Sequence, residues 1–159
     1  MLTDDNALTR SIWSDADFEV MSWHDCAIYA YWIDNANVEL VMDMDYICAW
    51  NQPVVPYDPL SFYIAPATFV VHGVTDVGLS LQSAANPFKL NAMHREDQRS
   101  IPNSDFSTWR WVLEGHHGNL SLRAVGYTLY LRRQPILVQA QSLSNEQRGG
   151  ISFAREPAL

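Results

Sequence analysis

The chain has 159 residues, of which 48% are hydrophobic and 18% are charged, and its formal net charge is −8. This length fits one domain, predicted over residues 1–159, and the composition excludes a disordered or fibrous chain. The acidic balance argues against nucleic-acid binding, which needs clustered cations to neutralise phosphates.

Apolar side chains recur at every second residue along most of the chain, which is the pattern of β-strands. In chain order, the predicted strands cover residues 27–33, 38–47, 61–65, 68–72, 77–81, 88–93, 109–113, 120–124, 127–132, 136–141 and 151–153. Pro66 separates two of these strands and favours an edge strand or a bulge there. The Pro-rich segment 51–59 and the polar segment 94–107 are predicted loops, and residues 1–13 are expected to be loosely ordered.

Capping residues predict two short helical turns. Ser14 and the acids after it begin a turn over residues 15–21, and Ser144 and Gly149 bound another within 142–150. About eight to ten short strands with so few helical turns predict a mainly β fold, as an antiparallel sandwich or barrel. An α+β arrangement is the alternative.

A hairpin is predicted around the loop at residues 115–118. Pairing Glu114 with Asn119 places Arg110 directly opposite Arg123, on the face away from the core. Because like charges opposite each other are unfavourable, we expect these arginines to be exposed or to have an acid between them.

Negative charge gathers at the start of the chain. Residues 1–50 hold ten acids and one base, whereas residues 51–159 have a net charge of +1. The acidic third could be a solvated face, or it could bind a basic protein partner. Arg132 could bind a carboxylate or phosphate, but it could equally be an intramolecular partner for these acids.

Glu39, Asp43 and Asp45 share one face of the predicted strand at 38–47, with neighbours about 7 Å apart. Such carboxylates could hold a cation, act as an acid–base pair, pair with Arg110 or Arg123, or simply face water.

Trp23-His24-Asp25 joins a titratable pair to an aromatic residue. Neighbouring side chains of an extended segment point to opposite faces, so we do not expect His24 and Asp25 to form a dyad. His24 could instead be a general base oriented by Asp43 or Asp45. The structural alternative is a hydrogen-bonded, half-buried His24 and a turn-forming Asp25.

Several kinds of site have no signature in the sequence. We find no nucleophile elbow, P-loop, dinucleotide fingerprint or metal-ligand spacing, and we predict no catalytic residue, metal or cofactor. Cys26 and Cys48 lie in apolar stretches and are expected to be buried free thiols. Without a signal peptide or a long apolar span, the expected location is the cytoplasm, away from membranes. The predicted binding residues are Trp23, His24, Asp25, Asp43, Asp45, Arg110, Arg123 and Arg132.

Several segments resemble those of a set of short uncharacterised bacterial proteins that have no established activity. These segments are Trp23-His24-Asp25, Asp43-Met44-Asp45-Tyr46-Ile47 with Trp50, Ala65-Pro66-Ala67-Thr68, and Gln141-Ser142-Leu143-Ser144 with Arg148-Gly149-Gly150. The resemblance implies a bacterial single domain and says nothing about mechanism. Small acidic proteins of this kind also resemble toxin-immunity proteins in type.

Three functional hypotheses follow from these patterns. The leading one is a non-enzymatic protein-interaction domain that uses its acidic third, with exposed aromatic residues as anchors. The second is a small metal-dependent hydrolase that uses His24, Asp43 and Asp45. The third is a small-ligand binder with a pocket flanked by Trp32, Trp50 or Trp111.

Overall fold

Ten antiparallel strands form one continuous sheet in a computed structural model that describes residues 1–159. Their order is β1-β9-β4-β3-β2-β6-β7-β8-β5, and β10 lies beside β4. The strands are β1 (Ile12–Ser14), β2 (Ala27–Asp34), β3 (Glu39–Asn51), β4 (Ser61–His72), β5 (Thr75–Leu81), β6 (Phe88–Ser100), β7 (Ser107–Gly115), β8 (Gly118–Ala124), β9 (Gly126–Leu131) and β10 (Ile136–Val138). The predicted mainly β fold is confirmed.

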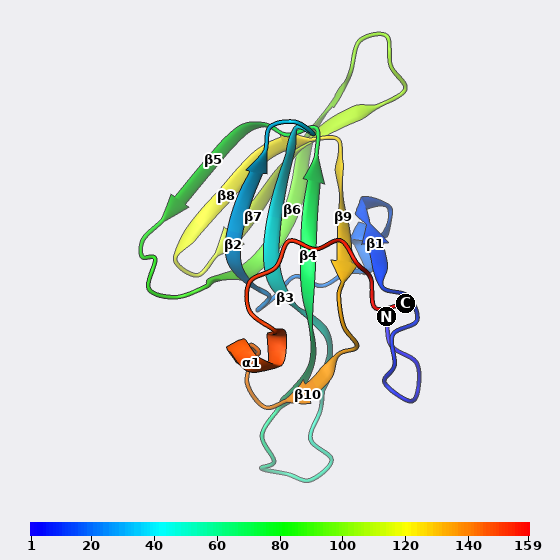
Figure 1. The fold of residues 1–159 in the computed structure, drawn as a ribbon, viewed down its shortest axis with the longest axis vertical. Coiled ribbons are helices and arrows are strands. Elements are labelled where there is room, and N and C mark those ends of the chain that lie inside the picture. Colours follow the sequence, from blue (N-terminus) through cyan, green and yellow to red (C-terminus); the bar gives the residue numbers. More distant parts are fainter.

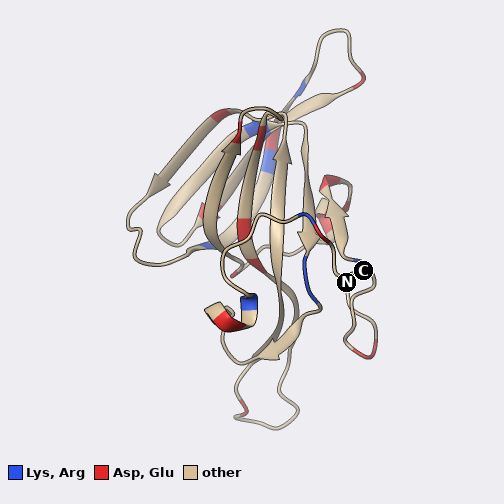
Figure 2. Cartoon of the chain, viewed as in Figure 1, with Lys and Arg blue, Asp and Glu red and all other residues tan.

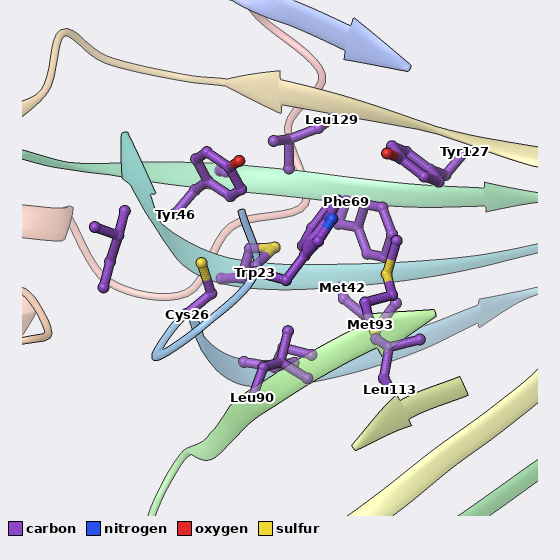
Figure 3. Packing of buried hydrophobic residues seen from close by; sticks show 14 of the residues in the cluster. Trp23, Cys26, Met42, Tyr46, Phe69, Leu90, Met93, Leu113, Tyr127 and Leu129 are labelled. Carbon is purple, nitrogen blue, oxygen red and sulfur yellow. The ribbon is translucent and has the colours of Figure 1, made fainter. Parts of the chain in front are cut away.

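The sheet folds over on itself into two layers (Figure 1). Its halves join where β2 pairs with β6 through Ala27–Lys89 and Ile28–Phe88, next to backbone hydrogen bonds of Leu90 with Asp25 and Cys26. Buried side chains from both layers form one hydrophobic core in which aromatic rings meet edge to face (Figure 3). Trp23, at 4% exposure, lies at its centre and contacts Tyr46 and Tyr127. This arrangement agrees with the sandwich-like fold expected from the alternation.

Both predicted helical turns are present. The 3₁₀ helix η1 (Asp15–Val20) begins at Ser14, and α1 (Asn145–Arg148) lies between Ser144 and Gly149, which has a φ of 77°. Neither helix is long and apolar enough to span a membrane.

The predicted hairpin register is also confirmed, because Glu114 pairs with Asn119 and Arg110 lies opposite Arg123.

The two strands predicted on either side of Pro66 form one long strand, β4. The Pro66 backbone faces the gap where β9 ends at Leu131, which pairs with Ala67, and β10 has not yet begun. The Pro66 carbonyl accepts a hydrogen bond from the Arg132 backbone N–H. No neighbouring strand offers a carbonyl opposite the proline nitrogen. The missing N–H therefore removes no hydrogen bond from the sheet.

Two further predictions were wrong. Half of the expected loop at 94–107 belongs to β6, because β7 supplies its ladder partners and Arg95 stacks over the Trp109 ring at 4.8 Å. Residues 151–153 form no strand. Instead, Phe153 packs on Trp32, with ring centroids 5.9 Å apart.

The C-terminal segment crosses the outer face of β3 and β4 and ends beside the N-terminus (Figure 1). Thr68 of β4 donates a hydrogen bond to the Ala154 carbonyl at 2.5 Å. The Leu159 N–H donates to the Ser11 hydroxyl at 3.0 Å. Residues 1–13, expected to be loosely ordered, place Leu8 and Trp13 in the core.

Candidate functional site

Asp43 and Asp45 of β3 are fully buried between the sheet and the C-terminal segment. Arg148 of α1 donates from Nη1 to Asp43 Oδ2 at 2.7 Å and from Nε to Asp45 Oδ1 at 3.2 Å. Arg132 donates to Asp43 Oδ1 at 2.6 Å, and the Tyr29 hydroxyl donates to Asp45 Oδ2 at 2.9 Å. We call these five residues the arginine lock; Figure 2 shows its basic residues on α1 and after β9.

The arginine lock leaves its carboxylates no free position. Burial raises the pKa of Asp45, opposed by hydrogen bonds from Leu143, Arg148 and Tyr29. Of the four alternatives for these strand acids, the structure therefore shows the intramolecular ion pair. The expected partners were wrong, however, because Arg110 contacts Glu96 at 3.0 Å and Arg123 contacts Asp97 at 2.5 Å. The partners come instead from Arg132 and Arg148, about 90 to 105 residues away along the chain.

The acidic first third does not form an exposed negative face. Of its ten acids only Asp4, Asp5 and Glu19 are exposed, and Arg95 lies 3.3 Å from Glu19. Arginines from the rest of the chain pair with Glu39, Asp43 and Asp45. The expected docking face therefore has few charges with which to attract a basic partner.

A tight turn brings the side chains of His24, Asp25 and His116 together. Asp25 has a φ of 63°, a left-handed conformation that aspartate tolerates better than most residues. Its carboxylate is 8% exposed and lies 3.4 Å from His24 Nε2 and 3.6 Å from His116 Nε2. Gln141 Nε2 donates to Asp25 Oδ2 at 2.8 Å. The expectation that neighbouring residues would diverge was wrong because it assumed extended backbone.

Each imidazole in this group has a different second environment. His24 Nδ1 lies 3.0 Å from the Asn91 carbonyl, and its ring stacks on Trp50 with centroids 6.0 Å apart. His116 stands at the tip of the β7–β8 hairpin, where its ring lines a pocket. His24 thus contacts neither Asp43 nor Asp45, so the proposed general base with those partners does not form. No three His, Cys, Asp or Glu side chains are grouped in a way that could hold a metal ion.

The pocket next to His116 has a volume of about 640 Å³. It lies among β2, the β5–β6 connection and the β7–β8 hairpin tip, and no Asp or Glu lines it. Its polar and basic lining residues are Tyr29, Tyr31, Ser83, Asn86, Lys89, His116, His117 and Ser142. None of the three tryptophans expected to flank a pocket lies here; Tyr29, Tyr31 and Phe88 supply the aromatic wall instead.

Tyr29 connects this pocket to the arginine lock. The Arg148 guanidinium carbon lies 3.9 Å from the centre of the Tyr29 ring, and Asp45 accepts the Tyr29 hydroxyl proton. Burial and the charge of Asp45 raise the Tyr29 pKa, and burial raises the pKa of Tyr31 to about 12. Both rings are therefore neutral walls in the physiological range, and Tyr29 is held rigidly.

The site offers groups for binding and few for covalent chemistry. Burial raises the pKa of both Cys26 and Cys48 to about 12, so their thiols are poor nucleophiles. The Tyr29–Tyr31 pair was visible in the sequence as aromatic alternation, but nothing there placed it beside His116. No family model, curated protein or solved structure matches the chain.

Proposed function

We propose that the protein is a non-enzymatic binding domain that takes a small molecule into the pocket beside His116. The observation that carries this proposal is a pocket of about 640 Å³ whose histidine is backed by the buried Asp25 carboxylate. Ligand sites of roughly 300–1,000 Å³ commonly combine apolar walls with a few fixed polar groups. Tyr29, Tyr31 and Phe88 supply the walls here, and the hairpin tip supplies the polar groups.

A screen of small soluble compounds by two-dimensional NMR tests this proposal. We expect bound compounds to shift the amide signals of Lys89 and His116 together. Ala85→Trp fills the pocket from an exposed loop position and should abolish these shifts. Ala36→Trp places the same bulk on an exposed turn and is the control. Shifts that survive Ala85→Trp, or a screen without any pocket shift, would contradict the proposal.

A second candidate function is protein binding at the end of the molecule formed by the β3–β4 loop and β10. One observation favours it: Val54 is 98% and Tyr57 is 101% exposed. The other exposed apolar residues of this end are Trp50, Val55, Leu60, Ile136 and Leu137. Exposed apolar patches often mark protein interaction sites. Like the protein-interaction hypothesis from the sequence, this candidate uses exposed aromatic residues as anchors, but its docking surface is apolar instead of acidic.

Salt separates the apolar docking mode from the acidic one. An apolar surface should hold a partner in both low and high salt, whereas attraction to acids weakens as salt rises. In pull-downs from the host lysate, Tyr57→Ser should lose any partner that binds this end. Val20→Ser changes an exposed apolar residue on η1 and is the control. A partner lost equally from both variants, or released by salt alone, would reject this candidate.

A further inference from the structure

Lys89 is a basic side chain that the fold leaves unused. Eight of the ten basic residues contact a carboxylate, and Arg133 donates to the Gln147 carbonyl. Lys89 alone makes neither an ion pair nor a side-chain hydrogen bond, although it is half-buried in the pocket wall. In a protein with a net charge of −8, a half-buried and unpaired ammonium is an available counter-charge for a ligand.

The other lining groups add to this positive character. His116 and His117 share the pocket with Lys89, and no Asp or Glu lines it. Asp25 approaches His116 from outside the lining, 3.6 Å from Nε2, and so helps to orient the ring. Three groups that can carry positive charge therefore surround one space without a competing carboxylate in its wall.

We propose that the pocket binds a small molecule in which a flat ring carries an anionic group, either a carboxylate or a phosphate. This inference rests on the proposed function and specifies its ligand class. The ring packs against Tyr29, Tyr31 and Phe88, since aromatic faces and edges favour a planar partner. The anion lies at Lys89 and His116, where a charge-assisted hydrogen bond is stronger than a neutral one.

The arginine lock supports this assignment by fixing the aromatic wall. Arg148 covers the Tyr29 ring, and Asp45 accepts its hydroxyl. A ring held from two directions loses little freedom when a ligand packs on it, which reduces the entropic cost of binding. The wall is thus arranged before a ligand arrives.

Matched probes on the intact protein test this inference. We would titrate AMP against adenosine, and benzoate against benzyl alcohol, by NMR and calorimetry. Each anion should bind at least about tenfold more tightly than its neutral counterpart, because hydrogen bonds to charged groups add this much. Comparing AMP with benzoate distinguishes a phosphate ligand from a carboxylate ligand.

Lys89→Met should weaken the anionic probes about tenfold and leave the neutral ones unchanged. Arg99→Met removes one positive charge from an exposed side chain elsewhere and should change neither. Equal binding of charged and neutral probes, or equal losses in both variants, would overturn the inference while the proposed function stands. If no probe and no screened compound shifts the pocket signals, the proposed function fails as well.

Discussion

The arginine lock and the Asp25 turn both bury carboxylates, but the two regions differ in the partners of these carboxylates and in the space beside them. Asp43 and Asp45 are surrounded by two arginines, a tyrosine hydroxyl and a backbone N–H, with no space beside them. Asp25 receives one amide hydrogen bond and otherwise faces two histidines, one of which lines a pocket. A buried charge with permanent counter-charges holds the structure together, whereas Asp25, with titratable partners beside open space, supports the pocket that we propose binds a ligand.

The two regions also lie in different parts of the fold. The acids on β3 lie beneath the C-terminal segment and the basic residues that follow β9 (Figure 2). The Asp25 turn directly precedes β2, where its backbone N–H donates to the Leu90 carbonyl of β6 and its carboxylate lies near the hairpin tip. Acids of the first third of the chain therefore form buried ion pairs at Asp43 and Asp45, and one of them, Asp25, lies beside the pocket histidine.

Removing Arg148 is the strongest way to break the comparison. Arg148→Met leaves Asp43 and Asp45 short of a counter-charge in a closed site, which should cost about 3–5 kcal/mol of unfolding free energy. Urea denaturation followed by tryptophan fluorescence measures this loss. Arg133→Met, which changes an exposed arginine next to Arg132, should cost little. A loss below about 1 kcal/mol for Arg148→Met would show that the lock contributes little stability.

The same substitution at both sites sharpens the contrast. Asp43→Asn turns an amide toward two arginines and should cost about 3 kcal/mol. Asp25→Asn should cost about 1 kcal/mol, because the amide oxygen still accepts from Gln141 and asparagine tolerates the positive φ. Thermal and urea unfolding of both variants give the comparison. Equal losses would mean that Asp25 is as structural as Asp43.

Tyr29→Phe tests the connection between the two regions. It removes one donor from the buried Asp45 carboxylate and keeps the ring that lines the pocket, so we expect a loss of about 1–2 kcal/mol. Tyr57→Phe removes a hydroxyl from a fully exposed ring and is the matched control. Urea denaturation should give a lower free energy of unfolding for Tyr29→Phe than for Tyr57→Phe. Equal values would show that the hydrogen bond from Tyr29 to Asp45 does not stabilise the fold.

The smallest effect concerns Glu39, at the rim of the same outer face. Although burial raises the pKa of Glu39, hydrogen bonds from Arg155 and His72 bring it below its usual value of 4.5. A carboxyl whose pKa is lower in the folded state stabilises the fold above its unfolded pKa, and this gain disappears as the pH falls through the folded pKa. The stability of wild type over Glu39→Gln, below about 1 kcal/mol, should therefore shrink between pH 6 and pH 3. A constant difference would contradict the assignment.

Local patterns in the sequence predicted the elements whose structure depends on near neighbours. The hairpin register followed from loop length and alternation. The caps at Ser14 and Ser144 followed from side chains that bond nearby backbone N–H groups, and the cap at Gly149 followed from the left-handed conformation that glycine adopts without strain. The polar half of β6 was missed because its strand character comes from pairing with β7. The division of β4 at Pro66 was predicted wrongly because the gap between β9 and β10, which accommodates the proline, exists only in the assembled sheet.

The candidate site depended even more on distant contacts. Trp23, His24 and Asp25 were predicted as binding residues, but His116 and Gln141 reach Asp25 from far along the chain. The positive φ of Asp25 also reversed the direction expected for its side chain. The only lysine, Lys89, stands out in an otherwise arginine-based chain, but its place in the pocket wall depends on the tertiary structure.

By itself, the sequence determined that this protein is built from antiparallel strands and that its front third is rich in acids, because period-two alternation and composition are local properties. Only the tertiary structure decided which acids pair with arginines and which one lies beside the pocket histidine. The reason is physical: a buried carboxylate is stabilised by whichever donors the fold brings within about 3 Å, and those donors come from residues that lie about a hundred positions away.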